Sequence, residues 1–100
     1  MTIKQEHEGS KRIVFVDGYL DALTSPELET ELEKVLPEST DLVIDFGGLE
    51  YISSAGLRVL LGSQKTMDAK GGKMTIRNVG ELIMEVFEET GFTNILDIED

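Results

Sequence analysis

Short apolar runs alternate with segments of helical periodicity along this chain, and that order limits the fold more than any other feature. The apolar runs occupy residues 13–16, 42–44, 74–76 and 95–98, and a weaker alternating run occupies residues 2–8. Apolar side chains at helical spacing fill the intervals between the four stronger runs. Strands that are separated by helices pair in parallel through right-handed crossovers. The order therefore predicts an α/β fold, with one mixed sheet of about five strands and helices packed mainly on one face.

The first helix is indicated by several independent signals. Thr24 and Glu27 have the spacing of a capping box. Leu23 and Leu28 have the spacing of a hydrophobic staple, and Pro37 stops the helical pattern. Because these signals agree, this helix is the most firmly predicted element of the chain.

The remaining elements are predicted from glycines and apolar runs. The second helix should end at Gly71, and the third at Gly91, after which Phe92 is placed to contact Phe87. The two strongest apolar runs, before and after the first helix, are expected to be central strands because they are continuously apolar. The weak run that leads into the turn at Gly9–Ser10 is expected to form an edge hairpin.

Composition limits the class of protein. At 100 residues, with 40% hydrophobic and 29% charged residues, one globular domain over residues 1–100 is expected. No stretch resembles a signal peptide or a membrane span, so a cytoplasmic location without membrane insertion is expected. The chain has no cysteine and a single histidine, His7, so neither a thiolate metal site nor a zinc site is expected. No cofactor is expected either. Its formal charge of −11 disfavours nucleic acid and favours a basic protein partner.

Polar side chains follow several predicted strands, where each strand gives way to a helix or turn. They are Asp17, Asp21, Asp45, Ser53, Ser54 and Asn78. The carboxyl ends of parallel strands meet at one edge of a sheet, where ligands and partners bind, so these side chains are expected to share a rim. Asp45 is expected to bond the backbone at its strand end. Asp21 is either a turn former or a partner contact.

Two serines, Ser53 and Ser54, stand at the start of the second predicted helix. One of them is expected to be the N-cap, with the free N–H groups of the helix facing the rim. Such a terminus stabilises negative charge, so a phosphate would be tolerated there. Ala55 and Gly56 would leave the backbone open to a large partner. From the spacing alone, a purely structural cap is the preferred interpretation.

A resemblance to a known family covers nearly the whole chain. The STAS domain of bacterial anti-sigma factor antagonists is similar to the stretch LVIDFGGLEYISSAGLRVLL, to GYLDALTSPELETEL before it and to the ending NVGELIMEVFEETGFTNIL. In that family a Gly-x-Leu/Ile-Asp segment precedes the first helix, a strand ends in aspartate, and Asp-Ser-Ser/Thr/Ala-Gly-Leu opens the second helix. The positions of this chain that match are Gly18, Asp21, Asp45, Ser54, Ala55, Gly56 and Leu57.

The resemblance implies a switch. Ser54 occupies the family's phosphorylated position, and Ser53 stands where many members have aspartate. The unmodified protein would bind an anti-sigma factor that is also a serine kinase, the phosphorylated form would release it, and a serine phosphatase would reset the cycle. Arg58 is added as an interface candidate because it is unfavourably placed for the helix dipole. The expected partner-binding residues are Asp21, Ser53, Ser54, Ala55, Gly56, Leu57 and Arg58.

Three alternatives to this switch differ in how far the sequence supports them. A serine hydrolase has little support, because His7 lies far from Ser54 in the sequence and no Gly-x-Ser-x-Gly motif is present. A phosphoacceptor domain using Asp45 would need adjacent carboxylates for magnesium and a lysine after the last strand, and neither is evident. Within the STAS resemblance, the alternative is an adaptor subunit of a transport or stress-signalling complex that has no phosphorylation cycle.

Overall fold

A six-stranded mixed sheet forms the centre of the computed structural model, which describes residues 1–99. Its strands run in the order β1-β2-β3-β5-β6, and β4 pairs with the far end of β2. The edge strand β1 is antiparallel to β2, whereas all the other pairs are parallel. The strands are β1 (Thr2–Glu8), β2 (Lys11–Leu20), β3 (Asp41–Asp45), β4 (Leu49–Ile52), β5 (Lys73–Arg77) and β6 (Asp97–Ile98).

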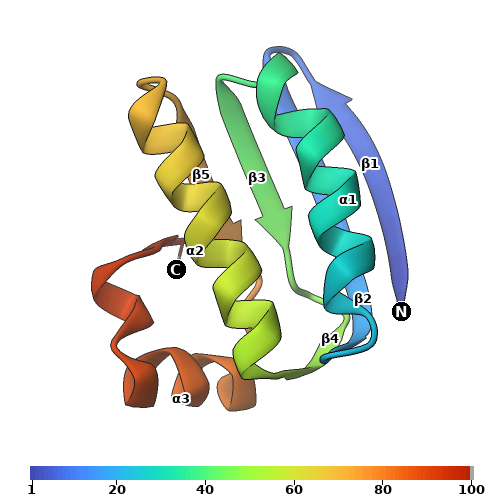
Figure 1. Ribbon diagram of the computed structural model, residues 1–100, viewed down its shortest axis with the longest axis vertical. Helices are drawn as coiled ribbons and strands as arrows, with labels where there is room; N and C mark the ends of the chain where they lie inside the picture. The colour runs from blue at the N-terminus through green and yellow to red at the C-terminus, as the bar shows by residue number, and fades with distance from the viewer. Residues whose placement is uncertain (100) are drawn as a thin grey trace.

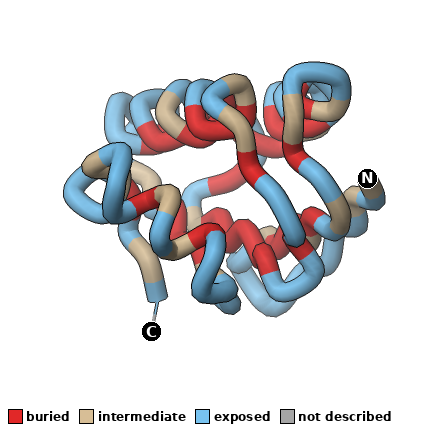
Figure 2. Tube along the Cα trace, turned by 90° about the horizontal axis from the view of Figure 1, so that it is seen from below, coloured by how far each residue is buried: buried red, intermediate tan, exposed pale blue. Residues whose placement is uncertain are grey.

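Three α-helices accompany the sheet, and two of them cover the same face. Helices α1 and α2 lie side by side across the front of the sheet in Figure 1, while α3 lies across its lower end. In Figure 2 the buried stretches of the chain face one another between this helical layer and the sheet. The helical elements are α1 (Ser25–Val35), α2 (Ser54–Ala69), α3 (Glu81–Thr90) and the short 3-10 turns η1 (Leu36–Glu38) and η2 (Phe92–Asn94). The predicted α/β class, with helices mainly on one face, is confirmed.

The main core lies between the sheet and the helices. The parallel register aligns Val14 of β2 with Ile44 of β3 and Ile76 of β5, and all three are completely buried. From the helical side Leu28 and Leu60 complete this layer. Full burial of each such side chain stabilises the fold by roughly 1.5–3 kcal/mol, so β2 and β3 are interior strands for the reason that the sequence indicated.

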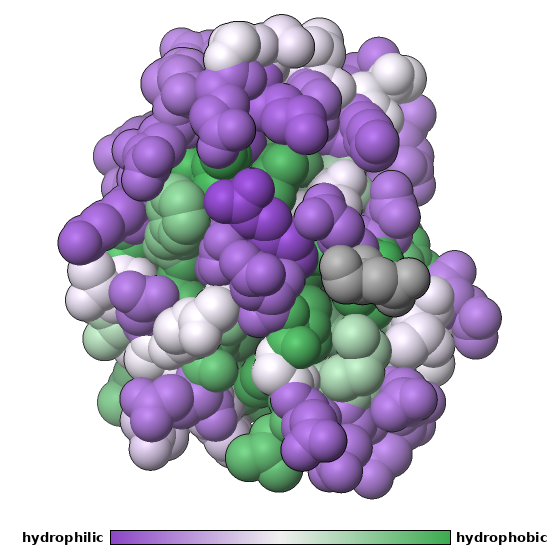
Figure 3. Space-filling view, turned by 180° about the vertical axis from the view of Figure 1, so that it is seen from behind, coloured by the Kyte–Doolittle hydropathy of each residue, from purple (hydrophilic) through white to green (hydrophobic). Residues whose placement is uncertain are grey.

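On the opposite face of the sheet, no helix of residues 1–99 provides cover (Figure 1). Figure 3 shows this face as largely hydrophilic, with apolar atoms visible between the polar side chains. Ile13 and Val43 are nevertheless buried on it, and the Arg77 guanidinium lies 5.8 Å from the centre of the half-buried Phe15 ring. The long polar side chains of this face therefore shield its few apolar residues.

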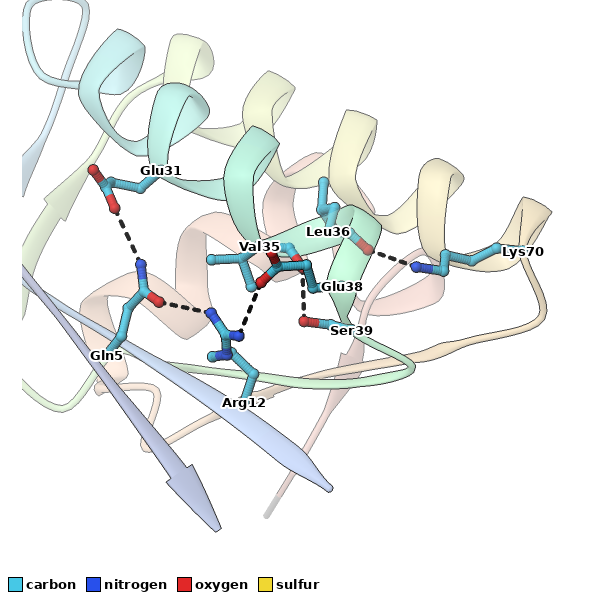
Figure 4. A network of polar contacts seen from close by, with 8 residues as sticks. All are labelled: Gln5, Arg12, Glu31, Val35, Leu36, Glu38, Ser39 and Lys70. Atoms are coloured by element: carbon cyan, nitrogen blue, oxygen red, sulfur yellow. Dashed lines mark hydrogen bonds and ion pairs between the residues drawn. The ribbon is translucent and has the colours of Figure 1, made fainter. Parts of the chain in front are cut away.

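A polar network holds the end of the molecule at which α1 ends (Figure 4). Arg12 of β2 donates to Gln5 of β1 at 2.9 Å and pairs with Glu38 of η1 at 3.3 Å. Lys70, just past α2, donates to the Leu36 carbonyl at 2.6 Å. These bonds join the β1–β2 hairpin and the end of α2 to the α1–η1 junction, and they leave the opposite end of the sheet for other roles.

Four details of the sequence prediction are wrong. Strand β4 was not anticipated, and the last strand is shorter than expected because η2 and a turn occupy residues 92–96. Thr24 stands at the N-cap position of α1 but makes no side-chain cap bond, since its hydroxyl donates to the Tyr19 carbonyl at 2.6 Å. Leu23 is 85% exposed, so it cannot act as a staple against the buried Leu28.

The predicted helix ends are confirmed. Gly71 and Gly91 both have positive φ angles, of 73° and 78°, which glycine adopts at little cost. Phe92, directly after α3, packs against the core cluster that contains Phe87. These two glycines therefore stop α2 and α3 where the sequence places them.

Candidate functional site

Ser53 links β4 to α2 and is held there by backbone bonds. Its N–H donates to the Leu20 carbonyl at 2.9 Å, and its own carbonyl accepts from the Leu57 N–H at 3.0 Å, which is the first bond of α2. The residue has the extended conformation of an N-cap, as predicted for one of the two serines. Its hydroxyl makes no cap bond, and the buried Oγ has no hydrogen-bond partner within residues 1–99. Ser53 therefore turns the chain into the helix without using its side chain as a cap.

Ser54 is the first residue of α2, and its side chain is exposed. The backbone amides of Ser54, Ala55 and Gly56 precede the first bonded amide of the helix, that of Leu57. This end of α2 therefore carries free donors and the positive end of the helix dipole. A negative group on the Ser54 hydroxyl would meet favourable rather than unfavourable electrostatics from the fold.

The other partner-binding candidates of α2 differ in their accessibility. Arg58 is exposed and Ala55 is half-buried, and both line a shallow hollow between the starts of α1 and α2. Gly56 and Leu57 are buried. A Cβ at Gly56 would stand 2.8 Å from Leu20 Cγ and 2.9 Å from Ile52 Cγ1. The expectation that Gly56 leaves the backbone open to a partner is therefore wrong, because this glycine faces the core.

Asp21 shapes the loop that leads from β2 into α1. Its Oδ1 accepts hydrogen bonds from the N–H groups of Leu23 and Thr24, both at 3.0 Å, and from the Thr24 hydroxyl at 3.1 Å. The bond from the Thr24 N–H is the main cause that lowers the pKa of Asp21 below its ordinary value. Asp21 is thus a turn former, as one of its two interpretations held, and it stands on the loop beside the hollow that Ala55 and Arg58 line.

Asp45 closes the middle of the rim. Its Oδ1 accepts from the Gly47 N–H at 2.8 Å, and its Oδ2 accepts from Arg77 Nε and Asn78 Nδ2, each at 2.8 Å. Burial opposes the charged carboxylate, but the bonds from Arg77, Gly47 and Asn78 outweigh it and lower the pKa of Asp45. Because both oxygens bond neighbouring residues, the predicted structural role is confirmed, and nothing in this arrangement favours the phosphoacceptor alternative.

The rim therefore divides into two groups. Asp45 and Asn78 meet at the Gly47–Gly48 loop, where a Cβ at Gly48 would also collide with the Asp17 carboxylate. The two serines lie instead at the β4–α2 junction, beside the end of β2 that leads to Asp21. The polar residues were expected to form one cluster, but they form two groups along the rim. The group around Asp45 is structural, and the group at Ser54 is accessible; we call the second group the Ser54 flank.

Sequence reasoning missed an aromatic pair next to this flank. Tyr19 of β2 lies opposite Tyr51 of β4, their ring centroids are 6.0 Å apart, and about half of each side chain is exposed. The sequence does place one tyrosine two residues before Asp21 and another two residues before Ser53. Without β4 in the predicted sheet, nothing indicated that the rings would meet.

Residues 1–99 contain neither a metal-binding cluster nor a membrane-spanning helix. The described side chains contain no group of three or more histidine, cysteine, aspartate or glutamate residues that could hold a metal ion. None of the described helices is both long and apolar enough to cross a membrane. His7 of the edge strand β1 pairs with Arg12 at the start of β2, whereas the β4–α2 junction lies beside Leu20 at the other end of β2.

A comparison with protein families decides where this chain belongs. The profile described as "STAS domain" matches residues 2–100. The chain belongs to the STAS domain family. A STAS relative named anti-sigma-B factor antagonist, from Bacillus subtilis, is 31% identical over 85 residues, which cover 85% of this chain and 78% of the relative.

Solved structures show the same fold. An anti-sigma factor antagonist from Mycobacterium paratuberculosis has a TM-score of 0.88 at 24% identity, over 97% of this STAS chain and 83% of that one. The Bacillus cell fate determinant SpoIIAA in its phosphorylated form has a TM-score of 0.76 at 17% identity, over 99% of this chain and 92% of that one. The six-stranded sheet with its three helices is therefore the STAS fold.

Proposed function

We propose that this STAS protein is an anti-sigma factor antagonist, a binding protein that acts in the cytoplasm and frees a sigma factor by occupying its inhibitor. The observation that carries the proposal is the exposed Ser54 hydroxyl at the first position of α2, in a chain whose relatives bear that name. The corresponding family position is the phosphorylated one, so Ser54 is the proposed switch. The proposed enzymatic partners are an anti-sigma factor with serine kinase activity and a serine phosphatase.

The proposed docking surface is smaller than the predicted set of partner-binding residues. It comprises the exposed or half-buried Ser53, Ser54, Ala55 and Arg58, together with the loop that Asp21 shapes. Gly56 and Leu57 support this surface from beneath, because both are buried. Their part in binding is therefore indirect, through the position of the first turn of α2.

A phosphate on Ser54 would act on the partner more than on the domain. It adds a charge of about −1.5 to −2. The free backbone amides at the start of α2 can donate hydrogen bonds to the phosphate and so stabilise its charge. A partner surface that fits a hydroxyl must instead accommodate both the charge and its hydration. If repulsion and desolvation cost about 3 kcal/mol, the affinity falls roughly a hundredfold. The domain would stay folded while its partner dissociates.

The test is affinity capture from an extract of the native cells. The bait is the unmodified protein, its Ser54→Ala variant or its Ser54→Asp variant, with Ser10→Asp as a control at an exposed serine in the β1–β2 turn. A partner with ATP-dependent serine kinase activity should be held by the wild type, Ser54→Ala and Ser10→Asp, and lost by Ser54→Asp. Retention of the same partner by Ser54→Asp would contradict the switch and favour the adaptor alternative.

A further inference from the structure

An apolar surface lies between β4 and α3. Leu82 of α3 is 70% exposed, and Tyr19 and Tyr51 are 55% and 47% exposed nearby. Two adjoining hollows share Glu50, Leu82 and Ile83 in their linings, so they form one continuous depression. We call this depression the Tyr51–Leu82 groove; its apolar lining consists of Tyr19, Leu49, Tyr51, Ile52, Leu82, Ile83 and Val86.

The exposure of Leu82 has no evident use within the described fold. Helix α3 packs on the core through Ile83 and Phe87, which are 3% and 0% exposed. Leu82 precedes Ile83 by one position and so projects from a different side of the helix. The floor of the groove is core, whereas its walls are large apolar side chains in contact with water. Clustered exposed apolar side chains of this kind mark interaction surfaces.

The charges around the groove are all of one sign. Glu50 lies between the two hollows, Glu81 borders the one beside Tyr19, and Glu85 and Glu89 border the one beside Val86. Among the residues that the structure describes, no lysine or arginine lines either hollow. The groove thus offers apolar contact area inside an acidic border, in a protein whose formal charge is −11.

We propose that the Tyr51–Leu82 groove binds a basic amphipathic segment of a protein partner, with apolar side chains against Leu82 and the tyrosines, and lysines or arginines against the glutamates. Such a segment satisfies both properties of the groove at once. A second copy of this chain would bring another acidic border, and an anionic lipid surface or a nucleic acid would bring phosphates, so all three are repelled.

The groove is continuous with the proposed docking surface. Strand β4 carries Tyr51 and Ile52 directly into Ser53, and Tyr19 stands two residues before Asp21. A partner seated at Ser54 can therefore reach the groove with an adjoining segment. The identity of that partner rests on the proposed function, whereas the chemistry of the segment rests on the groove alone.

The direct test uses a synthetic amphipathic peptide made only of leucine and lysine, with the leucines at helical spacing. It is titrated into the isotope-labelled full chain by NMR and into unlabelled protein by calorimetry. The amide shifts are expected to concentrate in β4 and the first two turns of α3. Leu82→Ser should weaken binding about tenfold. Ile95→Ser, which alters an isoleucine that is 42% exposed and lies outside the groove and the docking surface, should leave it unchanged.

A charge-matched pair of variants tests the acidic border. Glu85→Gln with Glu89→Gln should weaken binding severalfold at low salt, whereas Glu29→Gln with Glu33→Gln removes the same charge at the same helical spacing on α1 and should have little effect. Shifts spread over the surface, equal loss in both pairs, equal binding of a leucine–glutamate peptide, or self-association that depends on Leu82 would overturn the proposal. Neither ATP nor Ser54 enters this assay, so its failure would leave the phosphorylation switch untouched, and the reverse also holds.

Discussion

The backbone of Gly56 lies directly against the side chain of Leu20, so close that a Cβ at position 56 would stand 2.8 Å from Leu20 Cγ. This contact brings the first turn of α2 down onto the ends of β2 and β4. It places Ser54 at the surface and buries the two residues that follow Ala55. The glycine of the family motif therefore determines how closely the first turn of α2, which carries Ser54, packs against the core.

Gly56→Ala should destabilise the fold, because the added methyl group overlaps two core side chains, Leu20 and Ile52, which must shift to make room. The expected loss is about 1–2 kcal/mol, since overpacking outweighs the gain in helix propensity. Gly62→Ala is the matched control in the same helix, where a Cβ meets nothing within 4 Å. That variant should gain roughly 0.5–1 kcal/mol. Chemical denaturation of both variants checks the prediction, and equal stabilisation by the two would contradict it.

The Asp45 carboxylate should make the stability depend on pH in the acid range. Its folded-state pKa is lowered from the ordinary value of 3.8, so its contribution is fully present above that value and is lost as the pH falls through the lower folded pKa. Asp45→Asn should cost about 1–3 kcal/mol at neutral pH, because the new amide donors face Arg77 and Asn78. The difference between wild type and variant should shrink as the solution is acidified. Denaturation curves over that range measure it, with the exposed Asp97→Asn as the control; a difference that is constant with pH would refute the assignment.

The slowest amide hydrogen exchange is expected in β2 over residues 13–16 and in β3 over residues 42–44. Strand β3 is bonded on both sides, to β2 and to β5, and its central residues are buried. Strand β1 is a solvent-exposed edge and should exchange much faster. Native-state exchange followed by NMR gives the comparison. Fast exchange at residues 42–44 would contradict the sheet order.

A negative charge at Ser54 should leave the domain as stable as before or stabilise it by up to about 1 kcal/mol, since it interacts with the N-terminus of α2. Ser63→Asp provides the contrast within the same helix, because Ser63 is only 5% exposed and a charge there is buried. That variant should lose more than about 2 kcal/mol. Thermal melts of Ser54→Asp and Ser63→Asp decide the point. A collapse of the Ser54→Asp melting temperature would show that the fold cannot carry the charge.

The fold could be predicted from the sequence wherever burial is periodic. The central strands have uninterrupted apolar runs, and α1 and α2 show a clear apolar stripe. Strand β4 has neither signal. Its four residues are in turn buried, exposed, exposed and buried, which is neither an apolar run nor an alternation, and it pairs with β2 across a register shift at Gly18 and Tyr19. Short strands of this kind are fixed by their neighbour in the sheet, not by their own pattern.

The site was predicted only in part for a related reason. The position of Ser54 follows from the motif, but the inward direction of Gly56 depends on Leu20, which is distant in the sequence. Thr24 fits a capping box by its spacing, yet the Tyr19 carbonyl and Asp21 compete for its hydroxyl in the folded loop. The partners of Asp45 could be identified only once the register placed it opposite Arg77. Long-range packing therefore decided what local spacing could not.

The central claim is that phosphate on Ser54 releases the partner, and one measurement addresses it most directly. The protein is incubated with ATP and the captured kinase partner, the phosphorylated residue is located by peptide mass spectrometry, and the affinity for the partner is measured before and after. We predict phosphate on Ser54 and an affinity lower by roughly a hundredfold, with Ser54→Ala unmodified and still bound. Phosphate on Ser53, or an unchanged affinity after full modification of Ser54, would contradict the account.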